Sequence, residues 1–130
     1  MLILSQKQIE SILNLPGPQR YSHFIRRVVD SDEAWGLWTE GGWALSSTDE
    51  GETVFPLWPH REYAALCAVN EWEGYEPAAI PLDDLLTELL PKLGADHVRL
   101  SIFRSPDGQA VFPTIEQLTT DLRQELTRYG

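Results

Sequence analysis

The sequence contains little cysteine and no long apolar run. Its 130 residues include a single cysteine, Cys67, so no disulfide can form within the chain. No apolar stretch reaches the roughly 18 residues that a membrane span requires. The apolar start, MLIL, is too short for the hydrophobic region of a signal peptide. We therefore expect a cytoplasmic protein in a reducing compartment.

Basic residues are also scarce. Ten Lys and Arg residues stand against twenty Asp and Glu residues, which gives a formal net charge of -10. Nucleic acid and anionic membranes are disfavoured as ligands, because both bind through clustered Lys and Arg. Between Asp30 and Glu88 there are fourteen acidic residues and one basic residue, Arg61. This imbalance keeps a protein soluble, and it also suits a basic protein partner.

The familiar catalytic and cofactor motifs are absent. The sequence has no GxGxxG, P-loop, HExxH, CxxC or GxSxG pattern. Three separated histidines do not make a set of metal ligands. Cys67 lies on an apolar stripe and is expected to be a buried small residue rather than a nucleophile. We therefore predict no catalytic residue, no metal ion and no cofactor.

Apolar residues at helical spacing predict several helices. The first helix is expected from about Gln6 to Asn14, with Ser5 and Gln8 as a capping box. The others are expected over about 19–31, from Pro59 to near Asn70, from Leu82 until Pro91 and Gly94 end it, and from a second capping box, Thr114 with Gln117, to the C-terminus. In the helix predicted from Pro59, His60 would lie in the first turn, and Tyr63, Leu66 and Cys67 would be buried.

Tryptophan-rich segments predict a hairpin. WGLW and WAL flank Gly41-Gly42, a two-residue connection that suits a tight turn and places Trp38 opposite Leu45. Trp43 then shares a face with Trp38, while Trp35, Leu37 and Ala44 take the other face. Both faces are apolar, so one must pack on the core and the other needs a helix, a partner or a ligand over it.

Further strands are predicted along the chain. TVFPLW is expected to be an edge or bulged strand, because Pro56 lacks an N–H. EPAAI is a short strand, VRLSIF alternates as a strand, and QAVF returns as its partner after the turn signature SPDG. The predicted fold is a single α+β domain over residues 1–130, with two N-terminal helices and then a mixed or mostly antiparallel sheet of about five to six strands covered by helices.

Several motifs resemble a bacterial family known as domain-of-unknown-function family 2750. They are AWGLW, GWAL, VFPLWPHREYA, GYEPAAIPLDDLL and SPDGQAVFPTIEQLTTDL, in this order, and they extend from about Ser5 to Tyr129. The resemblance implies a small bacterial cytoplasmic protein and no known activity. From VFPLWPHREYA onward the order of elements is also similar to the serine-sensitivity-enhancing (SseB-type) domain, which favours a binding module but does not fix a function.

Two hypotheses of function follow, with a third open. The first is a non-enzymatic protein-interaction module, for example an immunity-like protein that masks a basic toxin, using an acidic surface rich in tryptophan. The second is a small-molecule-binding protein or enzyme with a pocket near Trp58, His60, Arg61 and Tyr75, in which Arg61 pairs an acidic ligand group. Self-association through the spare apolar face is the third. The candidate binding residues are Trp38, Trp43, Trp58, His60, Arg61, Trp72 and Tyr75.

Overall fold

The computed structural model describes residues 5–129. The α-helices are α1 (Gln6–Leu13), α2 (Gly17–Ser31), α3 (Arg61–Leu66), α4 (Leu82–Asp84), α5 (Leu90–Ala95) and α6 (Ile115–Tyr129), with a 3-10 turn η1 (Asn70–Trp72) and a π-helical turn η2 (Leu85–Leu89). The strands are β1 (Glu33–Thr39), β2 (Gly42–Trp43), β3 (Ser46–Ser47), β4 (Thr53–Leu57), β5 (Glu76–Pro81) and β6 (Arg99–Ile102). The α+β class is confirmed.

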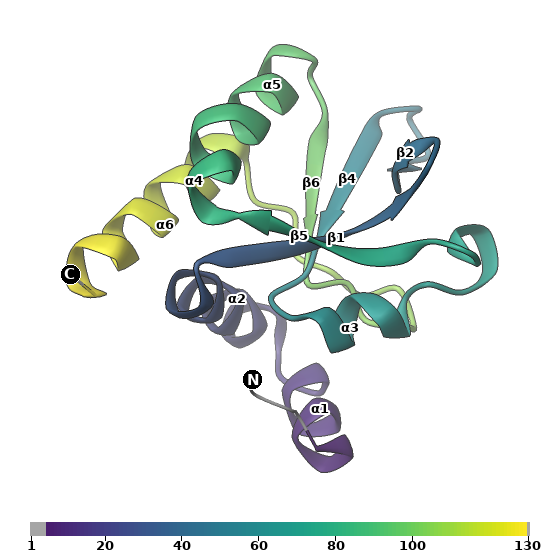
Figure 1. The fold of residues 1–130 in the computed structure, drawn as a ribbon, viewed down its shortest axis with the longest axis horizontal. Helices are drawn as coiled ribbons and strands as arrows, with labels where there is room; N and C mark the ends of the chain where they lie inside the picture. The colour runs from purple at the N-terminus through teal and green to yellow at the C-terminus, as the bar shows by residue number, and fades with distance from the viewer. Residues whose placement is uncertain (1–4, 130) are drawn as a thin grey trace.

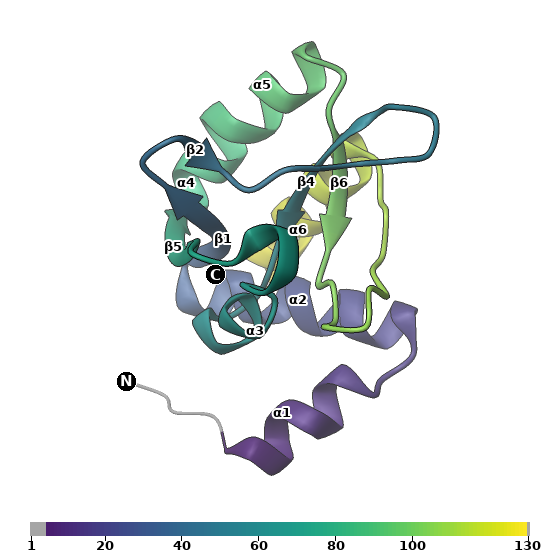
Figure 2. The same cartoon turned by 90° about the vertical axis from the view of Figure 1, so that its right-hand side faces the viewer.

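The strands form two sheets of three rather than the single larger sheet that was predicted. The first sheet has the order β2-β1-β5 and is antiparallel, while the second has the order β3-β4-β6 with β4 and β6 parallel. In Figure 1, β1 and β5 cross the direction of β4 and β6. Figure 2 shows β1, β2 and β5 on the left and β4 and β6 on the right. Among the described residues, one antiparallel bridge, Trp35 with Trp58, connects the two sheets.

Pro56 marks the place where the chain passes from one sheet to the other. Along one edge of β4, Thr53 and Val54 pair with β3, and Trp58 exchanges backbone hydrogen bonds with Trp35 at 2.8 and 2.9 Å. Residues two apart in a strand direct their backbone groups to the same edge, so Pro56 faces the gap between these pairings. Of the two predicted alternatives, an edge strand or a bulge, the edge strand is wrong, because β4 is central; the missing N–H of Pro56 lies where no donor is needed.

The tryptophan hairpin forms with a different register from the one predicted. Trp38 pairs with Trp43 rather than with Leu45, and the turn is Glu40-Gly41 because Gly42 already belongs to β2. Because the register moves by two residues, the strand residues Trp38 and Trp43 still share a face as predicted. Leu37 and Ala44 are buried in the core, and Trp38 and Trp43 share the opposite face.

Two helices differ from their predicted limits. The third helix is only α3, which ends at Leu66 rather than near Asn70, and the 3-10 turn η1 begins at Asn70. Leu66 is exposed rather than buried. Pro91 does not end the fourth helix but lies in the first turn of α5. The preceding π-helical turn, in which the Leu90 N–H donates to the Leu85 carbonyl, widens the helix where a proline ring would otherwise clash. The capping box of Ser5 and Gln8 is confirmed, with hydrogen bonds of 2.9 and 3.1 Å.

Near the C-terminus, two local predictions hold in part. QAVF does not form a strand, and only Val111 bridges to Ile102. The Thr114 hydroxyl accepts the Gln117 N–H at 3.0 Å, as a helix cap should. The Gln117 side chain, however, binds Asp121 rather than completing the box. The SPDG turn is confirmed by a hydrogen bond of 2.9 Å from the Gly108 N–H to the Ser105 carbonyl.

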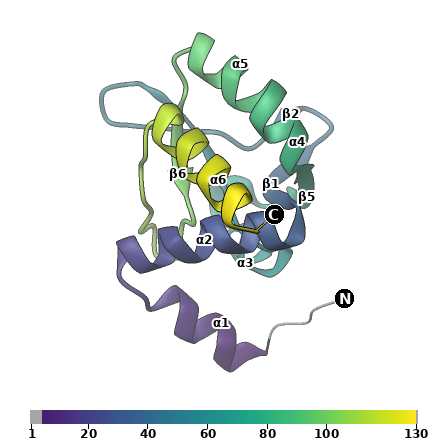
Figure 3. The same cartoon turned by 90° about the vertical axis from the view of Figure 1, so that its left-hand side faces the viewer.

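The main core lies between the second sheet and two long helices. Phe55, Leu57, Leu100 and Ile102 on β4 and β6 are buried together with Phe24, Val28, Leu118 and Leu122 from α2 and α6. Figure 3 shows α6 lying between α5 and α2. Among the described residues, none of the helices combines the length and the apolar character that crossing a bilayer would require.

Candidate functional site

Trp38 and Trp43 form an aromatic pair at the surface of the first sheet. Their ring centroids are 4.9 Å apart with planes at 72°, an edge-to-face contact between directly paired strand residues. The Trp38 side chain is 43% exposed, whereas Trp43 is half-buried. A tryptophan this exposed contributes little to the core, so its position favours contact with something outside the fold.

Gly36 makes room for the Trp43 ring. A Cβ at Gly36 would lie 2.9 Å from the indole, closer than side-chain atoms pack. The ring therefore lies directly over β1 and reaches Phe55 of the second sheet, with centroids 5.8 Å apart. The glycine between the tryptophans of WGLW thus has a steric purpose that the sequence alone did not reveal.

A hollow of about 400 Å³ opens beside this pair. One wall belongs to the first sheet and the other to the helical run α4–η2–α5. Its lining residues are Trp43, Ala79, Ile80, Pro81, Asp84, Glu88, Leu89 and Lys92. This hollow and the exposed ring of Trp38 are together called the tryptophan surface below.

Carboxylates surround the tryptophan surface. Glu76 pairs with Trp38 across β1 and β5, and Asp84 and Glu88 line the hollow; all three are exposed. Within residues 5–129, the ion pairs do not include these three acids. The cation in the hollow, Lys92, lies 3.5 Å from Asp96 outside it. The surface therefore combines aromatic faces, an apolar floor and a net negative charge, with three carboxylates against Lys92.

Trp58 and Trp72, which were predicted to be candidate binding residues, are buried. Their rings meet edge to face at 6.0 Å and 89°. Trp58 donates its Nε1–H to the Arg104 carbonyl at 2.9 Å, and Trp72 donates to the Leu45 carbonyl at 3.2 Å. Both indole N–H groups are thus used inside the fold, which is how tryptophan is accommodated in a core.

The other predicted residues lie around α3. His60 is the N-cap of α3 rather than part of its first turn, and its Nδ1 accepts the Glu62 N–H at 3.3 Å. Arg61 is exposed, and Tyr75 is half-buried. A ligand pocket formed by these residues stays a prediction.

Sequence reasoning missed Arg104. Its carbonyl accepts hydrogen bonds from Trp58 and from the Cys67 thiol, the latter at 3.3 Å. Its guanidinium lies 4.9 Å from the centroid of the Trp72 ring. No pattern in the sequence around Arg104 indicates these contacts, because Trp58 precedes Arg104 by 46 residues.

Cys67 is buried, as predicted. Burial raises the pKa of the Cys67 thiol to about 11, against smaller opposing effects of the Arg104 charge and the hydrogen bond with Trp58. The thiol therefore stays protonated at neutral pH, and the thiolate is the reactive form. This environment favours a packing role for Cys67.

Comparison with known proteins places the chain in one family. A family model described as "Protein of unknown function (DUF2750)" matches residues 21–122. This match covers most of the chain, and the chain therefore belongs to that family, as the sequence motifs indicated. A search of curated proteins finds no match. The likeness to the SseB-type domain and the bacterial origin stay predictions.

Proposed function

We propose that this member of the DUF2750 family is a non-enzymatic protein-interaction module, which takes up a basic segment of a partner protein on the tryptophan surface. The observation that carries the proposal is Trp38, exposed and stacked edge-on against Trp43 beside an acid-lined apolar hollow. Exposed aromatic residues of this kind are typical of the residues that dominate binding energy at interfaces.

The chemistry of the tryptophan surface suits an arginine or lysine side chain. An indole face attracts a guanidinium or ammonium group, and the aliphatic stem of such a side chain can cover apolar lining residues such as Ile80 and Leu89. Glu76 and Glu88 would pair the positive charge. The net charge of -10 would accelerate the encounter with a basic partner and make it sensitive to salt.

The proposed setting is the cytoplasm. A concrete form of the proposal is an immunity-like role, in which the acidic surface masks a basic toxin. The single reduced, buried thiol is compatible with a reducing compartment.

The test is affinity capture from host lysate, analysed by mass spectrometry after washes at low and at high salt. Four proteins are compared: wild type, Trp38→Ala, the double variant Glu76→Gln with Glu88→Gln, and the control Glu10→Gln with Glu116→Gln. The control removes the same two charges at exposed positions on α1 and α6. We expect a basic partner that wild type and the control retain at low salt and that the other two variants lose.

Two outcomes would contradict the proposal. One is a partner that all four proteins retain equally. The other is a second copy of this chain as the occupant, which light scattering would reveal as a wild-type dimer that Trp38→Ala turns into a monomer.

A further inference from the structure

A second cavity, of about 620 Å³, lies on the outer face of the second sheet. Val54 of β4 and Ser101 of β6 form its floor. The two residues lie on the same face of the sheet, because Ser101 pairs with Pro56, which is two residues from Val54 along β4. The loop around Thr48 forms one wall, and the segment from Gly108 to Phe112 forms another. This cavity, called the second-sheet pocket below, belongs to a different sheet from the tryptophan surface.

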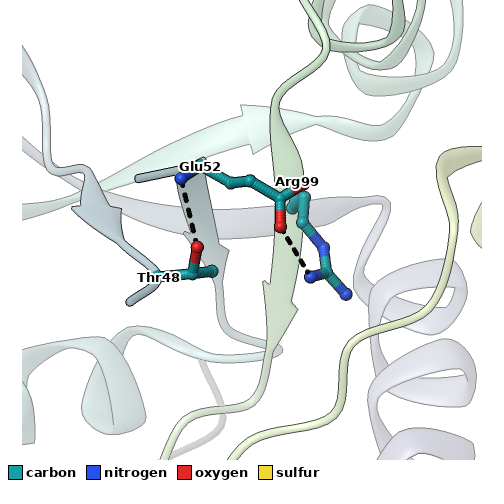
Figure 4. A network of polar contacts seen from close by, with 3 residues as sticks. All are labelled: Thr48, Glu52 and Arg99. Carbon is teal, nitrogen blue, oxygen red and sulfur yellow. Dashed lines mark hydrogen bonds and ion pairs between the residues drawn. The ribbon is translucent and has the colours of Figure 1, made fainter. Parts of the chain in front are cut away.

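The loop wall of the second-sheet pocket is tied to the sheet. The Thr48 hydroxyl accepts the Glu52 N–H at 3.1 Å, and the Glu52 carboxylate accepts a hydrogen bond from Arg99 of β6 at 3.2 Å. Figure 4 shows both contacts, with Glu52 between Thr48 and Arg99. The backbone closes the same turn, with the Thr48 N–H donating to the Glu52 carbonyl at 2.9 Å. The wall is therefore held in place by contacts within the fold.

Arg104 is the cation of the second-sheet pocket, and the core positions it. The buried Trp72 lies beneath its guanidinium, and the buried donors of Trp58 and Cys67 fix its carbonyl. Its nearest carboxylate partner, Glu71, is 4.0 Å away, at the limit of an ion pair. The side chain remains 30% exposed. A guanidinium that is stacked and only loosely paired is ready to accept a planar anion.

The backbone just before Arg104 is strained. Phe103 has a φ of 57°, in the left-handed region that a bulky side chain rarely adopts. Its ring is fully buried against Tyr63, with centroids 4.7 Å apart, and its N–H donates to the Leu57 carbonyl at 2.8 Å. This conformation turns the chain out of β6 and directs Arg104 to the pocket. Strain of this kind is concentrated where a fold must position a functional residue.

The charges of the second-sheet pocket restrict its ligand. One guanidinium, Arg104, stands among three carboxylates, Asp49, Glu50 and Glu71. A multiply charged anion such as phosphate would be repelled by these acids. A molecule with one carboxylate and one amino group satisfies both signs, and the exposed ring of Phe112 offers an apolar contact.

We propose that the second-sheet pocket binds a small zwitterion, with its carboxylate on Arg104 and its ammonium group on Glu71 and the acidic loop. The volume lies within the range of ordinary small-molecule sites. This site is independent of the tryptophan surface, and it gives the small-molecule hypothesis a second location, at Arg104, beside the one predicted near Arg61.

The test uses the isotope-labelled full chain and records backbone amide resonances during titration with each of the twenty standard amino acids at millimolar concentration. At least one should shift resonances of Ser46–Glu50, Ser101 and Gly108–Phe112. For each amino acid that binds, the amide derivative lacks the carboxylate and the N-acetyl derivative lacks the cation. Each derivative should bind at least about tenfold more weakly than the parent.

Variants decide the roles of the two charges. Arg104→Gln and Glu71→Gln should each weaken binding about tenfold or more, while Arg123→Gln, an exposed charge on α6, should leave it unchanged. Glu71 has a side chain 59% exposed, so its variant should fold even if Arg104→Gln does not. Trp38→Ala should bind the zwitterion like wild type.

Three results would overturn the proposal. The first is that no amino acid perturbs the second-sheet pocket. The second is that the amide or N-acetyl derivative binds as tightly as its parent. The third is that folded Glu71→Gln binds unchanged.

Discussion

Two pairs of tryptophans in this protein have similar ring geometry but opposite surroundings. Trp58 and Trp72 meet edge to face inside the core, and both indole N–H groups donate to carbonyl oxygens. Trp38 and Trp43 also meet edge to face, but Trp38 is exposed. Within the described part of the chain, no hydrogen bond involves the N–H of either ring in that pair. The buried pair serves the fold, and the pair that contains the exposed Trp38 is the one to which we assign recognition in the proposed function.

The largest expected effect follows from removing a member of the buried pair. Trp58→Ala should lower the free energy of unfolding by about 3–5 kcal/mol, because it leaves a large cavity at a fully buried position. Trp58→Phe keeps most of the volume but removes the donor to the Arg104 carbonyl, and should cost about 1–3 kcal/mol. Urea denaturation measures both. Equal costs for the two variants would show that the hydrogen bond, rather than the ring volume, dominates.

The support beneath the exposed pair is tested by Gly36→Ala. The new methyl group would lie 2.9 Å from the Trp43 ring, so the ring or the strand must move, at a cost of about 1–3 kcal/mol in unfolding free energy. Gly41→Ala is the control, since the nearest atom there, the Thr39 hydroxyl, is 3.6 Å away. Similar stability of both variants would mean that Trp43 can move from β1 without loss.

The features that the sequence predicted correctly depend on near neighbours. The Ser5 and Gln8 cap spans three residues, and the SPDG turn is equally local. The sharing of a face by Trp38 and Trp43 follows from strand alternation, which survives the error in register. These features require no knowledge of distant segments.

The division into two sheets and the position of Arg104 depend on distant segments. β4 pairs with β6, where Val54 meets Arg99, and no local pattern shows this pairing. Nor does a local pattern show that β1 meets the end of β4 only through the bridge between Trp35 and Trp58. The effect of Pro91 was misjudged for a related reason, since the π-helical turn that accommodates it is a property of the packed helix. The charge and tryptophan content indicated a recognition surface, but only the fold separates exposed rings from buried ones.

The thiol that supports the buried pair should make stability depend on alkaline pH. The Cys67 thiol and the Trp58 indole both donate to the Arg104 carbonyl. Burial raises the pKa of the Cys67 thiol from 9.0 to about 11. The folded state favours the neutral thiol. Its contribution to the free energy of unfolding is therefore fully present below about pH 9 and is lost as the pH rises towards 11. Between these values wild type should lose about 2 kcal/mol more unfolding free energy than Cys67→Ala, as measured by urea denaturation at each pH. Parallel curves for the two proteins would contradict this assignment.

The smallest effect on stability, and the clearest separation of the two pairs, is expected for Trp38→Ala. The ring is 43% exposed and meets the Trp43 ring edge to face, so its removal should lower the unfolding free energy by only about 1 kcal/mol. Partner affinity should nevertheless fall at least about tenfold, because exposed tryptophans at interfaces commonly carry about 2 kcal/mol or more of binding energy. Titration calorimetry with the captured partner measures the affinity, and urea denaturation measures the stability. A loss of stability comparable to that of Trp58→Ala, with affinity unchanged, would place Trp38 with the buried pair and remove the reason for assigning recognition to this surface.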